Sequence, residues 1–434
     1  MRSKKAFTIF LFIIFISFTV SGQKLLNSPY ARFNLGVLEP AGSFRSTGMG
    51  GISAGIRDNS SIYFLNPASY SGIDTNSFVF DFGLDYGINY LTDGSSTHLT
   101  NDLNFDHLMI GFPVTKGVGI AAGIVPFSNG YYHISEQVGA KDPGYDPITG
   151  GYLSVHTGEG SISKFFLGTG FNITKYFSAG INMTLLFGSI NRLNEIDFTD
   201  YYYMLHNNNT EKIQLSGINL NYGFQAIAPL KNGLFVNAGL SYESGKNYNY
   251  REERLSYLFS AYSTLDTLSH AIDTSKAYLP GTMRAGISFG KKNKFTVGFD
   301  YKSTEWSKAV VSGTGVSFGD SRAYNFGAEY IPEKFSNYSF ARRIEYRAGI
   351  HYEETYLNIN GDQIRETGFS IGFGVPMTRT LSLMASRNYS KANFFFDFSR
   401  RSGPEGSSLH KENIFTAGAS LNFYDFWFLK RKYD

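Results

Sequence analysis

The sequence predicts an all-β fold: a transmembrane antiparallel β-barrel of about 14 strands with an N-terminal hatch inside the lumen. Three observations support this prediction. Aromatic residues make up 17% of the chain and charged residues only 17%, against about 25% charged residues in typical soluble domains. Many segments of about ten residues alternate apolar and polar side chains. Polar residues also interrupt every apolar run beyond residue 22, which excludes further membrane-spanning helices.

The N-terminus has the order of a secretory signal peptide. Arg2, Lys4 and Lys5 precede an uncharged apolar run over 6–20, and small residues follow this run. We expect a signal peptide over 1–22, removed by cleavage after its last residue, Gly22. The alternative is a transmembrane anchor, for which the run is short, because a spanning helix needs about 20 residues.

The predicted wall strands are those in which one face is apolar and the other polar. Near the C-terminus, Phe415, Ala417 and Ala419 alternate with Thr416 and Gly418. Charges fall on the polar face, as expected when that face lines a lumen and the other faces lipid. The predicted strands are 77–90, 103–113, 117–127, 160–173, 176–190, 212–228, 234–247, 281–290, 294–303, 322–330, 343–352, 366–375, 380–389 and 412–423.

The predicted connections alternate between short turns and long loops. Outer-membrane barrels have short periplasmic turns and long extracellular loops, so we expect a barrel over 76–428 in the cell outer membrane. Both termini should then be periplasmic, and a charged tail over 429–434 should follow the last strand. The long predicted loops are 128–159, 191–211, 248–280, 304–321 and 390–411.

The segment over 23–75 does not have the pattern of a barrel wall. It is rich in small residues and turns, and Asn66-Pro67 is a turn-forming pair. It also carries apolar residues such as Ile52 and Phe64, which a disordered periplasmic tail would leave exposed to water. A folded plug inside the lumen is therefore favoured over a free tail.

Several motifs in this order resemble the FadL-type family of outer-membrane transporters for hydrophobic compounds. The hatch signature of that family is matched at Gly48, Gly50, Gly51, Asp58, Asn66, Pro67 and Ala68. Further similar places are 117–120 with Pro126-Phe127, 279–286, Asp300-Tyr301 with 305–307, and Arg347-Ala348-Gly349 with Tyr352.

The resemblance implies passive uptake of long-chain fatty acids or other hydrophobic compounds. It implies membrane lipid and a hydrophobic or detergent-like small molecule as partners. It also implies a lateral opening where the third strand is kinked, at Gly123, Pro126 and Phe127. A physical cause for such a kink is present, because Pro126 cannot donate a ladder hydrogen bond.

Two other classes of function stay open. Some FadL-like barrels do not transport but serve as accessory, partner-binding subunits of outer-membrane secretion or assembly machines, so outer-membrane protein partners are a second hypothesis. A barrel enzyme is the third. We expect no cofactor, metal or catalytic site, because the chain has no cysteine and its eight histidines lack metal-binding spacing. A net charge of +3 with scattered basic residues argues against nucleic acid.

Overall fold

The computed structural model describes most of the chain after residue 27, and the predicted signal peptide and C-terminal tail lie outside the described residues. The described ranges are 28–40, 42–92, 97–200, 205–259, 264–311, 317–336, 338–377, 389–407 and 409–426. Among them no helix is long and apolar enough to cross a membrane.

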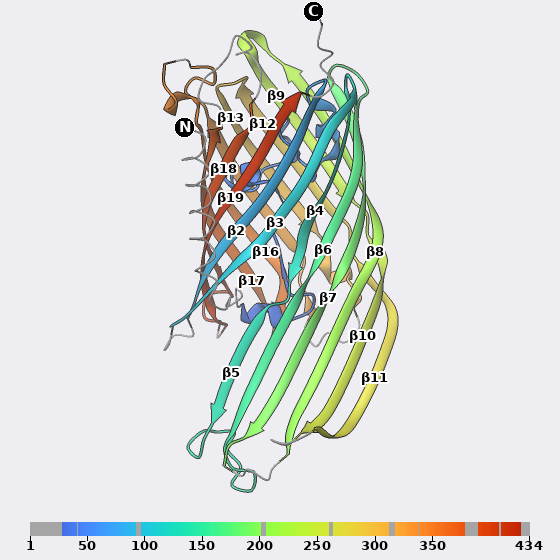
Figure 1. Cartoon of the computed structure of the whole chain (residues 1–434), viewed down its shortest axis with the longest axis vertical. Helices are drawn as coiled ribbons and strands as arrows, with labels where there is room; N and C mark the ends of the chain where they lie inside the picture. The colour runs from blue at the N-terminus through green and yellow to red at the C-terminus, as the bar shows by residue number, and fades with distance from the viewer. Residues whose placement is uncertain are drawn as a thin grey trace, which may run out of the picture.

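The described chain closes into a barrel of 14 antiparallel strands, which confirms the predicted fold class (Figure 1). Two wall strands are each built from two pieces, β9 (Leu234–Glu243) with β10 (Lys246–Phe259), and β11 (Thr264–Leu279) with β12 (Thr282–Lys291). The other wall strands are β2 (Ser77–Thr92), β3 (Thr97–Thr115), β4 (Val118–Asn129), β6 (Tyr152–Asn172), β7 (Phe177–Phe198), β8 (His206–Pro229), β13 (Phe295–Thr304), β15 (Ser321–Tyr330), β16 (Glu345–Ile359), β17 (Asp362–Pro376), β18 (Lys391–Ser402) and β19 (Lys411–Phe426).

The seam of the barrel joins the first wall strand to the last. β19 pairs with β2 from Lys411↔Thr92 to Phe426↔Ser77, so every wall strand has two neighbours over part of its length. Outward-facing side chains are large and apolar, for example Phe299 and Ile350, which are exposed on the outer face. Inward-facing neighbours such as Asp300 are polar and buried. This alternation places an apolar belt toward lipid and polar groups toward the lumen.

The apolar belt should not tolerate a charge. We expect Phe299→Arg to impair barrel formation, because arginine on the lipid face near the bilayer midplane costs about 2–4 kcal/mol. The folded fraction is measured from the difference in mobility between unheated and heated samples on a denaturing gel. Tyr338→Arg is the matched control, since Tyr338 is 98% exposed outside the wall strands. Equal folded fractions for the two variants would contradict a lipid-facing Phe299.

Six strands extend well past the rest of the barrel at one end and form a projecting sheet (Figure 1). Its order is β5 (Tyr132–Val138), β6, β7, β8, β10, β11. Most of 128–159, 191–211 and 248–280 is therefore strand, and their prediction as loops was wrong. The physical reason is that both faces of a sheet in water can be polar, as at the Glu252↔Asp273 pair, so the apolar-polar alternation ends where the strands leave the membrane.

One wall strand was not predicted. The partner of β17 is β18, over 391–402, so most of 390–411 is strand and its prediction as a loop was wrong. The strand predicted over 380–389 falls almost wholly on residues 380–388, which lie outside the described residues. The continuous run Phe394-Phe395-Phe396 hides the alternation of β18 in the sequence. Phe395 faces inward, where its ring lies 4.6 Å from the ring of Phe44 in the hatch.

Candidate functional site

The N-terminal segment fills the lumen, as the fold prediction required. Its short helices are η1 (Pro29–Arg32), α2 (Phe44–Thr47) and η2 (Pro67–Gly72), with a two-residue strand β1 (Val37–Leu38). Asn66 begins η2 because its side chain accepts a hydrogen bond from the Ala68 N–H, and Pro67 occupies the first helical turn. We call residues 42–76 the hatch and residues 28–40 the N-terminal arm.

Polar wall side chains satisfy the irregular backbone of the hatch. Asp300 accepts hydrogen bonds from the N–H groups of Ser53 and Ala54, both at 2.7 Å. The amide of Asn182 donates to the Phe64 carbonyl at 2.8 Å. Further bonds run from Gln225 to the Ala54 and Ile56 carbonyls and from Ser288 to the Gly55 carbonyl. Buried backbone groups without partners are costly, so these side chains fix where the hatch sits.

Glycines let the hatch backbone touch the wall backbone. Gly50 has φ of +67° and donates its N–H to the Ser370 hydroxyl at 2.9 Å. A Cβ atom on Gly50 would lie 2.7 Å from the Ile350 carbonyl oxygen. Gly51, with φ of +87°, and Gly48, beside Gly372, are equally close to the wall. Glycines on the inner wall face the hatch in the same way: Gly119, Gly170, Gly180, Gly239, Gly286, Gly327 and Gly349.

A buried ionic cluster fastens the hatch to one side of the wall. Arg45 in α2 pairs with Asp58 of the hatch and with Glu329 of β15, both at 2.7 Å. Glu329 also accepts from Arg347 of β16 at 2.8 Å. Burial by itself would raise the pKa of Asp58, but Arg45, Lys391 and Lys334 together outweigh burial and hold that pKa well below its usual range. The predicted site residue Asp58 therefore lies in a charge-paired structural contact.

The N-terminal arm closes the opposite end of the lumen. Tyr30 and Leu35 pack with inward side chains of the projecting strands in an apolar cluster that includes Ile190 and Trp306. Ser28 donates its hydroxyl to Glu412 at 2.6 Å, at the end of β19 remote from Phe426. The first described residue thus lies at the opposite end of the barrel from the last. The expectation that both termini are periplasmic falls on residues outside the described ranges.

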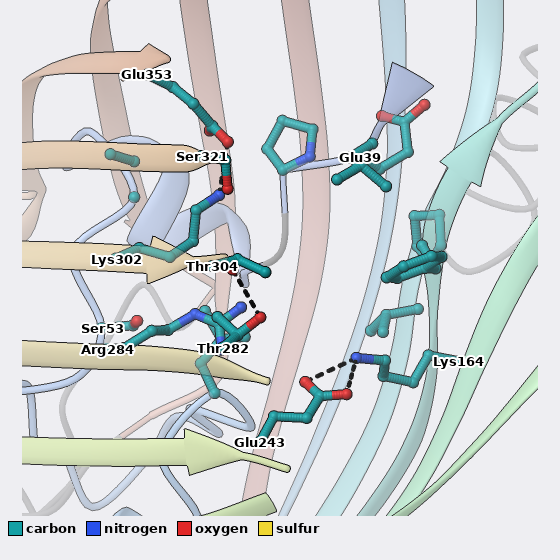
Figure 2. Close-up of a pocket in the computed structure, with 18 of the residues that line it drawn as sticks. Glu39, Ser53, Lys164, Glu243, Thr282, Arg284, Lys302, Thr304, Ser321 and Glu353 are labelled. Carbon is teal, nitrogen blue, oxygen red and sulfur yellow. Dashed lines mark hydrogen bonds and ion pairs between the residues drawn. The ribbon is translucent and has the colours of Figure 1, made fainter. Parts of the chain in front are cut away.

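A cavity of about 280 Å³ remains between the arm and the hatch (Figure 2). Charged residues line it in pairs: Lys164 donates to Glu243 at 2.7 Å, and Lys302 to Glu353 at 2.8 Å. Apolar and aromatic residues complete the lining, and these are Leu38, Phe64, Leu65, Val125, Phe127, Leu186, Tyr248, Leu279, Trp306 and Phe395. The lining is therefore amphipathic, with charged residues on the lumen side of the wall as the sequence predicts.

Two ionisable groups of the cavity have no ion-pair partner among the described residues. The Arg284 guanidinium points into the cavity (Figure 2), and its Nη1 is buried without a hydrogen bond to any described group. Glu39 of the arm lines the same space, and burial raises its pKa to about 7. The carboxylates of Glu243, Glu353 and Asp300 lie near Arg284, and its Nη1 keeps an N–H that can donate a hydrogen bond to a guest.

The wall is interrupted beside this cavity. The β3–β4 ladder ends at Leu108↔Ile124. Beyond that point β4 pairs with β6 and, at Ser128 and Asn129, with β1 of the arm. Asn104 and Asp106 on β3, and Val125, Pro126 and Phe127 on β4, line the cavity from the two sides of the interruption.

The three residues predicted at a kink, Gly123, Pro126 and Phe127, are brought together here. A Cβ atom on Gly123 would lie 2.5 Å from the Leu108 carbonyl oxygen, at the last paired position. Pro126 falls at a register shift in the β4–β6 ladder. Sequence reasoning missed Arg45, Gln225, Ser288 and Glu329. A charged residue in a segment of small and apolar residues was the available signal for Arg45.

Solved structures with the same fold are titled as a hydrocarbon channel, a FadL homologue and a toluene transporter. The CymD monoaromatic hydrocarbon channel matches with a TM-score of 0.56 and 16% identity, over 91% of this chain and 99% of that chain. A Pseudomonas aeruginosa FadL homologue matches with a TM-score of 0.56 and 12% identity, over 89% and 99%. The Ralstonia pickettii toluene transporter TbuX matches with a TM-score of 0.55 and 14% identity, over 88% and 98%.

These likenesses show a FadL-type fold: a 14-strand barrel around an N-terminal plug. A search of curated proteins found no match. The family model described as BamG matches residues 3–434, nearly the whole sequence. The chain therefore belongs to the BamG family.

Proposed function

We propose that this protein is an outer-membrane channel through which small amphipathic molecules diffuse between the lumen and the bilayer. The observation that carries the proposal is the interruption between β3 and β4, because the cavity lining includes residues from both of its edges. The hatch and the N-terminal arm fill the two ends of the lumen. The shorter route out of the cavity therefore leads through the wall into the bilayer. The hydrocarbon channels of the same fold support this class of passenger.

The cavity lining favours a passenger with a long apolar body and a carboxylate, such as a long-chain fatty acid. Arg284 supplies a cation whose Nη1 makes no hydrogen bond to any described group. Phe64, Val125 and Phe127 supply apolar contacts. A hydrogen bond to a charged group contributes about 1.5–3 kcal/mol, which corresponds to about 10- to 100-fold in affinity.

Removing the Arg284 guanidinium should lower the affinity for fatty acids more than the affinity for their neutral analogues. We expect Arg284→Gln to weaken binding of cis-parinaric acid, a fluorescent fatty acid, by about tenfold or more. Binding of the matching fatty alcohol should change little. Fluorescence titration of the purified protein in a non-ionic detergent measures both constants. Arg342→Gln is the control, since Arg342 is exposed and pairs only with Glu333. Equal losses for the acid and the alcohol would contradict a role for Arg284 in binding the carboxylate.

The interruption itself needs a separate test, because binding does not prove passage. Asn104→Trp should fill the space between β3 and β4 and slow transfer of the same fatty acid into liposomes containing the protein. Equilibrium binding in detergent should be largely kept. If transfer is as fast as in the unchanged protein, the passenger does not leave between β3 and β4.

The orientation of the barrel is also testable on cells. We propose that the projecting sheet is extracellular, because four of the connections at the other end have only two to four residues, those between β3 and β4, β6 and β7, β8 and β9, and β12 and β13. An epitope tag inserted at Asp142, in the exposed connection between β5 and β6, should be labelled on intact cells as strongly as after lysis. A tag at Tyr338, at the other end, should be labelled only after lysis. The reverse pattern would invert the proposed orientation.

A second function, that of a partner-binding subunit of an outer-membrane machine, is supported by the projecting sheet. In the described ladders β5 pairs only with β6, and the outer part of β11 pairs only with β10, so the sheet has two free edges. Exposed apolar residues Ile148, Leu268 and Ile272 lie on it. Photocrosslinking from Ile272 in cells, followed by mass spectrometry, tests this function independently of fatty-acid binding.

A further inference from the structure

The outer wall carries a groove that is separate from the lumen. It has a volume of about 1160 Å³ and lies across β13, β15, β16, β17, β18, β19 and β2. Its apolar side is a row of outward residues that are cross-strand neighbours from one strand to the next. The row consists of Phe299, Phe326, Ile350, Phe369, Phe398, Phe415 and Ile88.

A second row borders the groove two residues further along each strand, away from the end that bears Ser77 and Phe426. It is amphipathic where the first row is apolar. Small side chains at Thr367 and Asn413 leave space between larger neighbours. The whole row consists of Tyr301, Tyr324, Tyr352, Thr367, Arg400, Asn413 and Tyr90.

Arginine and lysine side chains face outward along and above this second row. Arg400 lies in the row itself, beside Thr367, and the described structure gives it no ion pair. Arg322 and Arg365 lie two residues beyond Tyr324 and Thr367, on either side of Glu354. Arg365 is half exposed and 4.0 Å from Glu354. Lys411 is exposed at the start of β19. Four cations against two carboxylates, Glu354 and the Asp320 that lies near Arg322, leave this rim positively charged.

A cation on the lipid face is tolerated only near the interface. There its natural counter-charge is the phosphate of a lipid headgroup, since each arginine or lysine near an anionic surface contributes about 1 kcal/mol. The tyrosines of the second row are the side chains that barrels place at this level. The groove below the rim is then at the depth of the acyl chains, in contact with phenylalanine and isoleucine.

We propose that this face is a specific binding site for a phosphorylated lipid with several acyl chains. The chains lie in the groove between the two rows, and the phosphate pairs with Arg322, Arg365 and Arg400. The size of the groove and the unbalanced positive rim together favour this occupant over a second copy of the chain, which would bring its own positive rim against this one. The site does not depend on any transport activity.

The probe is diphosphoryl hexa-acyl lipid A, compared with its dephosphorylated form carrying the same chains. Native mass spectrometry of the purified protein, released from detergent in the presence of each lipid, measures the retained adduct. We expect the phosphorylated form to bind at least tenfold more tightly. The triple variant R322Q/R365Q/R400Q should lose about fivefold per arginine, since 1 kcal/mol corresponds to that factor, and so lose the preference.

The matched control is R251Q/R342Q/K308Q, which removes three exposed charges from other parts of the molecule and should keep the preference. T367W keeps every charge but fills the groove, and it should weaken retention of the phosphorylated and dephosphorylated forms alike. Heat-modifiable mobility verifies that each variant is folded. Equal retention of the two lipids by the unchanged protein would overturn the proposal. So would a lipid preference that survives in the triple variant, or a dimer through this face that lipid does not displace.

Discussion

Arg45→Ala should release the hatch from the wall while the barrel stays closed. Asp58 and Glu329 each lie 2.7 Å from the Arg45 guanidinium. The substitution leaves both carboxylates buried without this shared cation. Breaking a buried ion pair by removing one partner costs about 3–5 kcal/mol. The strands do not depend on this contact, because their ladders are complete without it. We therefore expect a folded barrel with a loosened plug.

The absence of cysteine from the chain makes this measurable. Ser46 is fully buried in α2, so Ser46→Cys should be protected from a water-soluble maleimide in the otherwise unchanged protein and labelled when Arg45 is also alanine. Arg342→Ala is the control, because exposed pairs such as Arg342–Glu333 contribute only about 0–1 kcal/mol. Protection that persists in the Arg45→Ala protein would show that the cluster does not hold the hatch.

The same contact has a defined pH dependence. The folded-state pKa of Asp58 lies below its ordinary value of 3.8. A carboxyl with a lowered pKa contributes its stabilisation above the ordinary value and loses it as the pH falls through the folded-state pKa. Exposure of the thiol in Ser46→Cys, measured with 4,4′-dithiodipyridine because it reacts with thiols in acid, should therefore increase in strong acid even with Arg45 present. Asp58 should cause little change in that exposure between pH 6 and 8.

Gly50→Val should have the second large effect, and through a different cause. Valine at φ of +67° is strained, which costs about 1–3 kcal/mol. Its Cβ would also lie within 2.9 Å of the Ile350 and Phe326 backbone, and overpacking of this kind adds about 1–3 kcal/mol. Wall strands in a closed barrel cannot move aside, so the hatch must leave its place.

Conductance in planar bilayers measures whether the hatch has left its place. We expect Gly50→Val to conduct small ions at a level approaching that of a deletion of residues 28–72, and well above the unchanged protein. Gly139→Val serves as control, since a Cβ there has only the Asp142 side chain within 4 Å. If the deletion conducts as little as the intact protein, the segment is not what blocks the lumen.

The wall was predictable from the sequence because lipid and lumen impose opposite demands on alternate residues. Phe299 and Asp300 illustrate this, since each faces the side that its polarity favours. The projecting strands lacked that signal, because water lies on both of their faces. The hatch was predictable as a segment, but its anchors were not. Arg45 and Glu329 are 284 positions apart in the chain, and no local pattern relates them.

The candidate site was only partly foreseeable for the same reason. Gly123, Pro126 and Phe127 were identified from one strand, and they do lie where the ladder ends. The cation at Arg284 could be read as one more polar lumen residue, and nothing nearby in the sequence indicates that it has no partner. That fact depends on which groups surround it from distant strands and from the hatch.

The position of the N-terminal arm constrains the order in which the molecule can be built. Ser28 contacts Glu412, 384 positions later, while the hatch fills the other end of the lumen. The ladder between β2 and β19 is the last that the chain can complete, because β19 ends the described wall. Threading the arm and hatch through a finished ring would drag Arg45 and Asp58 past the whole inner wall. The arm and hatch must therefore already be enclosed when the final hairpin docks, so ring closure and plug folding form a single step late in biogenesis.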